Sequence, residues 1–271
     1  MLARDQNAVA YMEQGTERRR DGMEPHEQDW LRLPLDGAVN VRELGGYPTA
    51  NGGRTRFHRF LRADSLGRLT PWDKRFLYGY GVRAIVDLRD ATEVEAEPDC
   101  FLGKDVAYEN IPLLAVDLAD PDAVERVFGA QNFSMDNLYC LMLENYDAIR
   151  ACLRFIADAP EGCVLFHCAV GKDRTGILAM LLLSLAGVDK WDIVANYIQT
   201  RPNLMRDEVF VADWNDPSRE PFREGMSSSV HTIETIYDYM ELVHGGVESL
   251  LLECGVPDED VACIRRRLVG N

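Results

Sequence analysis

The sequence predicts an α/β protein in which a central, mostly parallel sheet is flanked by helices. Short apolar runs at residues 82–88 and 164–166 are typical of buried strands, and segments with helical patterning alternate with them, as in α/β proteins. The chain has 271 residues, of which 46% are hydrophobic, so it can bury a substantial core. We expect the ligand site to lie beyond the carboxyl ends of the strands.

The chain is expected to form one elaborated domain over residues 31–271. Residues 1–30 are polar and read as an N-terminal arm. An insert or lid is expected near 198–245, because residues 213–229 are irregular, acidic and proline-bearing. Long loops of this kind are either functional or plain surface, and the sequence leaves both open here.

The individual elements are indicated by local signals. Glycine pairs at 45–46 and 52–53 predict a turn or hairpin. Thr70 and Pro71 predict the N-cap and first residue of a helix, and Gly81 its end. The other predicted elements are a strand at 108–113, helices at 120–128 and 135–158, and helices at 175–186, 189–200, 232–244 and 257–268.

The composition excludes several classes of protein. A net charge of -16 argues against binding of nucleic acid, which needs clustered Lys and Arg. The seven cysteines form no CxxC pair, so neither a disulfide framework nor a metal site is indicated, and no cofactor is expected. Residues 1–30 contain no apolar signal core, and the apolar run at 176–188 is too short to span a membrane. We expect a cytoplasmic protein, with export by a route without a signal peptide left open.

One loop carries most of the chemical information. The stretch HCAVGKDRTG, residues 167–176, lies between an apolar strand and an apolar helix. It is not a Walker A loop, because Asp173 follows Gly171 and Lys172 where Ser or Thr is required. A loop of this length can turn its backbone N–H groups inward and bind an anion, assisted by the helix N-terminus. The predicted phosphate-binding residues are Ala169, Val170, Gly171, Lys172, Asp173 and Arg174.

The same loop can support covalent catalysis. A helix N-terminus and nearby cations stabilise a thiolate at Cys168, which can attack phosphorus and form an intermediate that water hydrolyses. The planar guanidinium of Arg174 can clamp two phosphate oxygens, a geometry that lysine lacks. Thr175 can donate its hydroxyl to the departing sulfur. His167 is expected to orient the loop rather than to act as a base.

The loop resembles the signature HCxxGxxR[ST]G of the cysteine-dependent protein tyrosine phosphatase superfamily. Its Lys-Asp pair is similar to that of bacterial tyrosine and phosphoinositide phosphatases whose loop reads HCxxGKDRTG. NVRELGGY at 40–47, RFLRAD at 59–64, AIVDLRDATEVEAEPD at 84–99 and GVPDEDVACIRRRL at 255–268 also resemble that branch. The match departs at Glu43, where Asp is expected, and at Ala63-Asp64, where Ser usually follows Arg62.

This resemblance implies a phosphatase fold of dual-specificity size and a metal-free phosphomonoester hydrolase. Its substrates would be phosphotyrosine and, as further candidates, phosphoserine, phosphothreonine or phosphoinositides, and the loop would take phosphate, sulfate or vanadate. A lysine at the position of Lys172 accompanies lipid activity in the resembling enzymes; a solvated lysine is the alternative. A phosphate-recognising pseudophosphatase, a sulfurtransferase and an arsenate reductase are the rival hypotheses.

The source of the catalytic proton stays open at this level. The WPD triplet that carries the acid in many members of the superfamily is missing. The resemblance favours Asp173, and the other candidates are Asp117, Asp120 and Asp122, which follow a predicted strand. Asp87 and Arg89, at the end of another strand, are expected to brace the loop or to contact the substrate.

Overall fold

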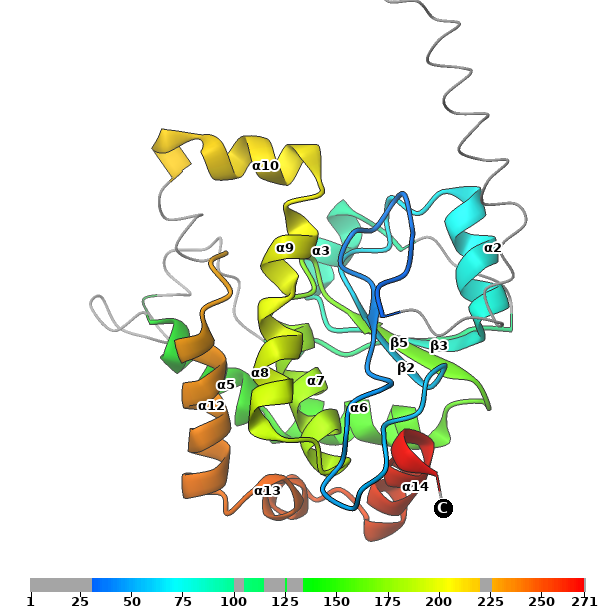
Figure 1. Ribbon diagram of the computed structural model, residues 1–271, viewed down its shortest axis with the longest axis vertical. Helices are drawn as coiled ribbons and strands as arrows, with labels where there is room; N and C mark the ends of the chain where they lie inside the picture. The colour runs from blue at the N-terminus through cyan, green and yellow to red at the C-terminus, as the bar shows by residue number, and fades with distance from the viewer. Residues whose placement is uncertain (1–30, 100–104, 115–124, 126–133, 220–225, 271) are drawn as a thin grey trace, which may run out of the picture.

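The computed structural model describes residues 31–99, 105–114, 125, 134–219 and 226–270 (Figure 1). The predicted N-terminal arm at 1–30 and the helix expected at 120–128 lie outside the described residues, apart from the single position 125. No helix in the described part is both long and apolar enough to cross a membrane.

A five-stranded sheet with the order β1-β2-β5-β3-β4 forms the centre of the molecule. Strands β2 (Phe60–Ala63), β5 (Cys163–His167), β3 (Val82–Asp87) and β4 (Ala107–Asn110) are parallel, and the short β1 (Arg42–Glu43) pairs antiparallel with β2. The prediction of a mostly parallel sheet in an α/β fold is therefore confirmed.

The central strand β5 is covered on both faces, which explains its continuous apolar sequence. Val164 and Phe166 pack into the larger hydrophobic cluster, whereas Cys163 and Leu165 alternate into a smaller cluster on the opposite face. Helix α2 (Pro71–Tyr80) covers the smaller cluster. Helices α5 (Met135–Leu143), α6 (Tyr146–Asp158) and α7 (Asp173–Leu185) belong to the larger one (Figure 1).

Helix α7 leaves the central strand and is buried on nearly every side. It contacts α5, β2, β5, α8 (Lys190–Ile198) and α13 (Val247–Glu253). An amphipathic pattern is missing because no face of this helix meets solvent. The remaining helices are α3 (Ala91–Ala96), α9 (Thr200–Leu204), α10 (Glu208–Asn215), α12 (Val230–Val243) and α14 (Asp258–Val269), with a 3-10 turn at Pro217–Arg219.

The helix predicted to start at Thr70 is confirmed. The side chain of Thr70 accepts a hydrogen bond from the backbone N–H of Asp73, whose carboxylate accepts one from the Thr70 N–H in return. Gly81 ends the helix in the left-handed region, with a φ of 105°.

The segment predicted to be helical over 135–158 is divided into α5 and α6. Asn145 interrupts the pattern because its side chain accepts a hydrogen bond from the N–H of Ala148 and caps the second helix. The described part of the stretch 213–229, which leaves out 220–225, is also less irregular than predicted. Its first residues complete α10, and Pro217–Arg219 form the 3-10 turn.

Candidate active site

The loop at 168–172 joins β5 to α7 at the carboxyl edge of the sheet. In the register of the parallel strands, His167 at the end of β5 lies beside Ala63 of β2 and Asp87 of β3. The side chains that follow these three strands therefore gather around the loop, as the fold class predicts.

Cys168 is the first residue of the loop and is 2% exposed. Its sulfur accepts hydrogen bonds from the backbone N–H of Gly171 at 3.3 Å and from the hydroxyl of Thr175 at 3.1 Å. Both contacts stabilise negative charge on the sulfur. The hydroxyl of Thr175 is thus within hydrogen-bonding distance of the Cys168 sulfur.

The carbonyl groups of the loop are held from outside. Ser65 N–H donates to the carbonyl of Ala169 at 3.0 Å. The side-chain amide of Asn40 donates to the carbonyls of Val170 and Gly171 at 3.0 and 3.2 Å. Because a trans peptide points its N–H opposite to its carbonyl, outward carbonyls turn the N–H groups toward the centre of the loop.

Arg62 also holds the loop from outside, and the sequence analysis did not name it as a candidate site residue. Its guanidinium donates to the carbonyls of Gly171 at 2.8 Å and Lys172 at 3.3 Å, and to the side chain of Asn196 in α8 at 2.6 Å. Burial lowers the pKa of Arg62 to about 10, which leaves it charged at neutral pH. The signals that point to Asn40 and Arg62 are the stretches 40–47 and 59–64, each of which lies at a strand of the sheet.

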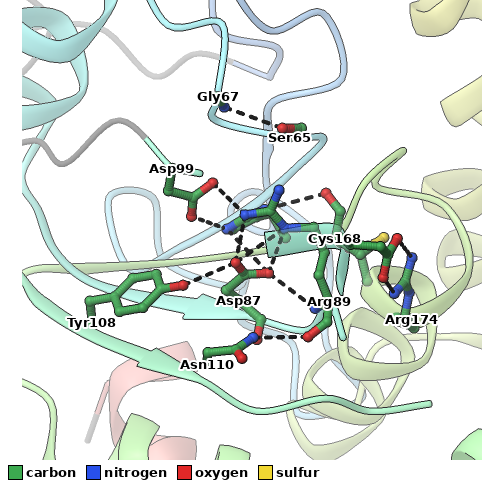
Figure 2. Close-up of polar contacts among 12 residues, drawn as sticks. Ser65, Gly67, Asp87, Arg89, Asp99, Tyr108, Asn110, Cys168 and Arg174 are labelled. Atoms are coloured by element: carbon green, nitrogen blue, oxygen red, sulfur yellow. Dashed lines mark hydrogen bonds and ion pairs between the residues drawn. The ribbon is translucent and has the colours of Figure 1, made fainter. Parts of the chain in front are cut away.

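Arg174 lies beside Cys168 (Figure 2) and is 15% exposed. Its two terminal nitrogens donate to the two carboxylate oxygens of Glu93 in α3, the second at 2.8 Å. Burial lowers the pKa of Arg174, but its hydrogen bond to Glu93 and the charges of Cys168, Glu93 and Asp173 outweigh it and raise the pKa above its ordinary value. The guanidinium is therefore charged and held in one orientation.

Glu93 is another site residue that sequence reasoning missed. Its carboxylate also accepts the backbone N–H of Asp90 at 3.0 Å, in a capping box at the start of α3. The pattern Asp90-x-x-Glu93 inside the stretch 84–99 could have indicated a rigid helix start. Nothing in the local sequence indicates that this helix faces Arg174.

Asp173 is the first residue of α7, and its side chain is 25% exposed. One carboxylate oxygen, Oδ1, lies 3.0 Å from Nζ of Lys172 and accepts a hydrogen bond from the hydroxyl of Tyr139 in α5. Lys172 is only 2% exposed, so it is not a solvated lysine. The other candidate acids, Asp117, Asp120 and Asp122, lie outside the described residues.

A buried polar cluster lies beside Cys168, next to the start of the loop (Figure 2). Arg89 donates to both carboxylate oxygens of Asp87, at 2.9 and 2.7 Å, and to Asp99 at 2.8 Å. His167 Nε2 lies 2.8 Å from the other oxygen of Asp99, a close polar approach rather than an aligned hydrogen bond. Asp87, Asp99 and His167 lie close enough together to hold a metal ion, but the guanidinium of Arg89 already bonds both carboxylates.

A groove of about 360 Å³ opens beside the loop. Ala169 and Val170 of the loop form part of its wall, and Leu204 of α9 and Phe210 of α10 form another part. Helices α9 and α10 belong to the insert predicted near 198–245. The groove thus connects that segment with the loop.

Comparison with known proteins identifies the family. Residues 33–270 match the family described as the tyrosine phosphatase family. A tyrosine-protein phosphatase of Nostoc commune is 32% identical over 225 residues, which cover 77% of this chain and 74% of that protein. The triple specificity protein phosphatase PtpB of Mycobacterium tuberculosis is 29% identical over 198 residues, covering 63% of this chain and 69% of that protein.

Among solved structures, a crystal structure of P. aeruginosa TpbA in complex with phosphotyrosine aligns with a TM-score of 0.40 and 16% identity, covering 83% of this chain and 96% of that one. The family match extends over nearly the whole described chain and includes the loop around Cys168. The Nostoc commune relative independently covers about three quarters of both sequences. The chain therefore belongs to the tyrosine phosphatase family.

Proposed function

We propose that this enzyme hydrolyses phosphotyrosine through a cysteinyl-phosphate intermediate, in a single domain over residues 31–271. The observation that carries the proposal is the position of the Cys168 sulfur. It accepts hydrogen bonds from Gly171 and Thr175, within a loop whose carbonyls are bonded from outside, and Arg174 lies beside it. A thiolate in an inward-facing ring of N–H groups is suited to attack a bound phosphate.

In the first step, the sulfur of Cys168 attacks phosphorus while the bond from phosphorus to the leaving oxygen breaks. Arg174 and the loop N–H groups bind the non-bridging oxygens and their developing charge. Asp173 transfers a proton to the leaving oxygen, which departs as a neutral alcohol. Asp117, Asp120 and Asp122 remain the alternative donors.

In the second step, water attacks the phosphorus of the intermediate and the sulfur leaves as a thiolate. The carboxylate of Asp173 accepts the proton from this water, which restores the starting state and releases inorganic phosphate. The Thr175 hydroxyl, at 3.1 Å from the sulfur, stabilises the thiolate as it forms.

We assign the remaining residues to positioning roles, in which they act through other side chains of the site. Asp87 and Arg89 are assigned as positioning residues, because both are buried beside the start of the loop and bond one another. His167 Nδ1 lies 3.3 Å from the carbonyl of Cys168, which fits an orienting role. Glu93 positions Arg174. The α9–α10 segment is assigned as a wall of the substrate groove.

The proposed substrate range starts from phosphotyrosine. The M. tuberculosis relative is named a triple specificity phosphatase, which supports phosphoserine, phosphothreonine and phosphoinositides as further candidates.

The proposed compartment is the cytoplasm. The buried cysteines of the described residues are free, which suits the reducing cytoplasm.

The test is phosphate release in the presence of a chelator and a reductant, comparing a phosphotyrosine peptide with phosphatidylinositol 3-phosphate. We expect faster release from the peptide and no release by Cys168→Ser, which should still bind vanadate or phosphate. Binding without turnover by the unaltered protein would identify a pseudophosphatase. Turnover of thiosulfate or arsenate in place of phosphoesters would identify the sulfurtransferase or reductase alternative.

A further inference from the structure

A chain of buried hydroxyl groups leads to Asp173 from two helices that sequence reasoning did not connect with the site. Tyr139 of α5 donates to Asp173 Oδ1, and the hydroxyl of Tyr197 in α8 lies 2.6 Å from that of Tyr139. The two tyrosines are 0% and 1% exposed. Buried hydroxyls in such an arrangement hold one another in place, because a lost partner is costly in the interior.

The direction of these hydrogen bonds follows from counting protons. An ionised carboxylate only accepts, so the single hydroxyl proton of Tyr139 points to Asp173. Tyr197 must then donate to the oxygen of Tyr139. Burial, together with the charge of Asp173, raises the pKa of both tyrosines, so both stay protonated and act as donors at neutral pH.

The donors to Asp173 converge on a single oxygen. The hydroxyl of Tyr139 and Nζ of Lys172 both contact Oδ1, and no hydrogen bond among the described residues uses Oδ2. A proton on Oδ1 would compete with these two donors. The proton of the neutral carboxyl group is therefore carried on Oδ2, the oxygen left for the substrate.

We propose that Tyr139, held by Tyr197, is a positioning residue that fixes the orientation of the Asp173 carboxyl group and reserves Oδ2 for proton transfer to the leaving oxygen. This inference rests on the proposed acid role of Asp173. In the first step the Oδ2 proton moves to the oxygen that leaves phosphorus. In the second step Oδ2 takes a proton from the attacking water.

The test uses Tyr139→Phe, which keeps the ring and removes only the hydroxyl. The substrates are aryl phosphates with leaving groups ranging from a phenol like that of tyrosine to 2,4-dinitrophenol. The measured quantity is kcat/KM, which reports the step in which the leaving group departs. Tyr78→Phe is the matched control, because Tyr78 also donates to an aspartate, Asp105, at 2.6 Å, but on the exposed surface.

We expect the kcat/KM of Tyr139→Phe to fall about tenfold for the poorest leaving group, which is a part of what general acid catalysis contributes. The kcat/KM for dinitrophenyl phosphate should fall little, because its leaving group needs no proton. Tyr197→Phe should show a smaller loss of the same kind, and Tyr78→Phe none. Equal loss by Tyr139→Phe on every substrate would overturn the inference, because it indicates a packing role. A thermal melt of each variant checks that it is folded.

Asp173→Asn separates this inference from the proposed function. If Asp173→Asn shows no dependence on the leaving group, the acid role of Asp173 itself fails. If Asp173→Asn shows that dependence while Tyr139→Phe behaves as the unaltered protein does, only the role of Tyr139 fails. The double variant should be no slower than Asp173→Asn alone, because Tyr139 acts through that carboxyl group.

Discussion

At the scale of single residues, the site pairs the guanidinium of Arg174 with the carboxylate of Glu93, which is itself fixed in place. Glu93 accepts from both terminal nitrogens of Arg174, and the capping box of α3 holds Glu93 in turn. A guanidinium that is already oriented loses less conformational entropy when it binds phosphate. The geometry depends on the planar fork of Arg174 and not on its charge alone.

Replacement of Arg174 tests this dependence. Arg174→Lys keeps the charge but loses the paired contact with Glu93 and the bidentate grip on phosphate. We expect kcat/KM on a phosphotyrosine peptide to fall by roughly 100-fold or more. The comparison is Arg154→Lys, which changes an exposed arginine on α6 and should leave kcat/KM unaltered. Near-normal activity of Arg174→Lys would show that charge suffices.

Gly171 is a second position where one residue decides the geometry. Its φ is +72°, and an added Cβ would lie 2.5 Å from the carbonyl oxygen of Ala63 in β2. Gly171→Ala must therefore displace the loop from the strand. We expect a loss of stability of about 1–3 kcal/mol and weaker binding of vanadate.

Gly53→Ala is the control for this change. Its nearest contact would be an ordinary 3.5 Å to the side chain of Thr49, and its φ lies outside the left-handed region. Thermal melts and vanadate titration should distinguish the two alanines. Unchanged vanadate affinity in Gly171→Ala would mean that the loop tolerates the displacement.

At the scale of elements, the site depends on the ends of three parallel strands. β2 brings Arg62, β3 brings Asp87, and β5 leads into Cys168. Asp87 lies opposite His167 in the register of β3 and β5, and the guanidinium of Arg89 turns back to bond Asp87. Asp87 and Arg89 thus form a buried ion pair at the end of β3, and the backbone N–H of Leu88 between them donates to the carbonyl of His167 at 2.9 Å, which ties the start of the loop to this strand.

This ion pair makes a prediction for stability and its dependence on pH. Burial raises the pKa of Asp87, but hydrogen bonds from Arg89 and the charges of His167 and Arg89 outweigh it and lower the pKa below its usual value. Such a group stabilises the fold fully above the unfolded pKa of about 3.9, and the contribution is lost as pH falls through the lower folded value.

Asp87→Asn should therefore destabilise the protein at neutral pH by about 3 kcal/mol, because it leaves the guanidinium of Arg89 without its main partner. The loss of Tm on acidification below pH about 4 should be smaller in this variant than in the unaltered protein. Asp158→Asn, at an exposed pair on α6, is the comparison. Identical acid sensitivity of the unaltered protein and Asp87→Asn would contradict the assignment.

At the scale of the whole molecule, charge opposes the binding of an anionic substrate. The chain carries a net charge of -16, and the groove beside the loop is lined by Asp64, Glu97, Asp207 and Asp213 with one cation, Arg68. In the proposed mechanism the cations Arg174 and Lys172 attract phosphate locally, whereas the surrounding field would favour substrates with positive flanks.

Two phosphotyrosine peptides that differ only in flanking Glu or Lys residues test this effect. We expect a higher kcat/KM for the lysine peptide at about 20 mM salt and a much smaller difference at about 500 mM, because salt screens exposed charges. p-Nitrophenyl phosphate, which has no flanks, is the reference substrate. A preference that persists unchanged at high salt would indicate direct contacts in place of the overall field.

Much of the fold and the catalytic loop could be predicted because the signals are local. The helix start at Thr70, the end at Gly81 and the apolar run of β5 depend on neighbouring residues. Helix α10 and the break between α5 and α6 were missed. Both are short features that begin at a capping side chain, Asp207 for α10 and Asn145 for α6, rather than long repeating patterns.

The fold class and the loop could be predicted from the sequence, because Cys168, Arg174 and Thr175 lie within eight consecutive positions. The surroundings of the loop are known only from the three-dimensional arrangement of the chain. Arg174 bonds Glu93, which is 81 positions away in the sequence, and Asn40 bonds the carbonyl of Val170, which is 130 positions away. Contacts over such separations depend on strand register and helix packing, for which local propensity contains no information.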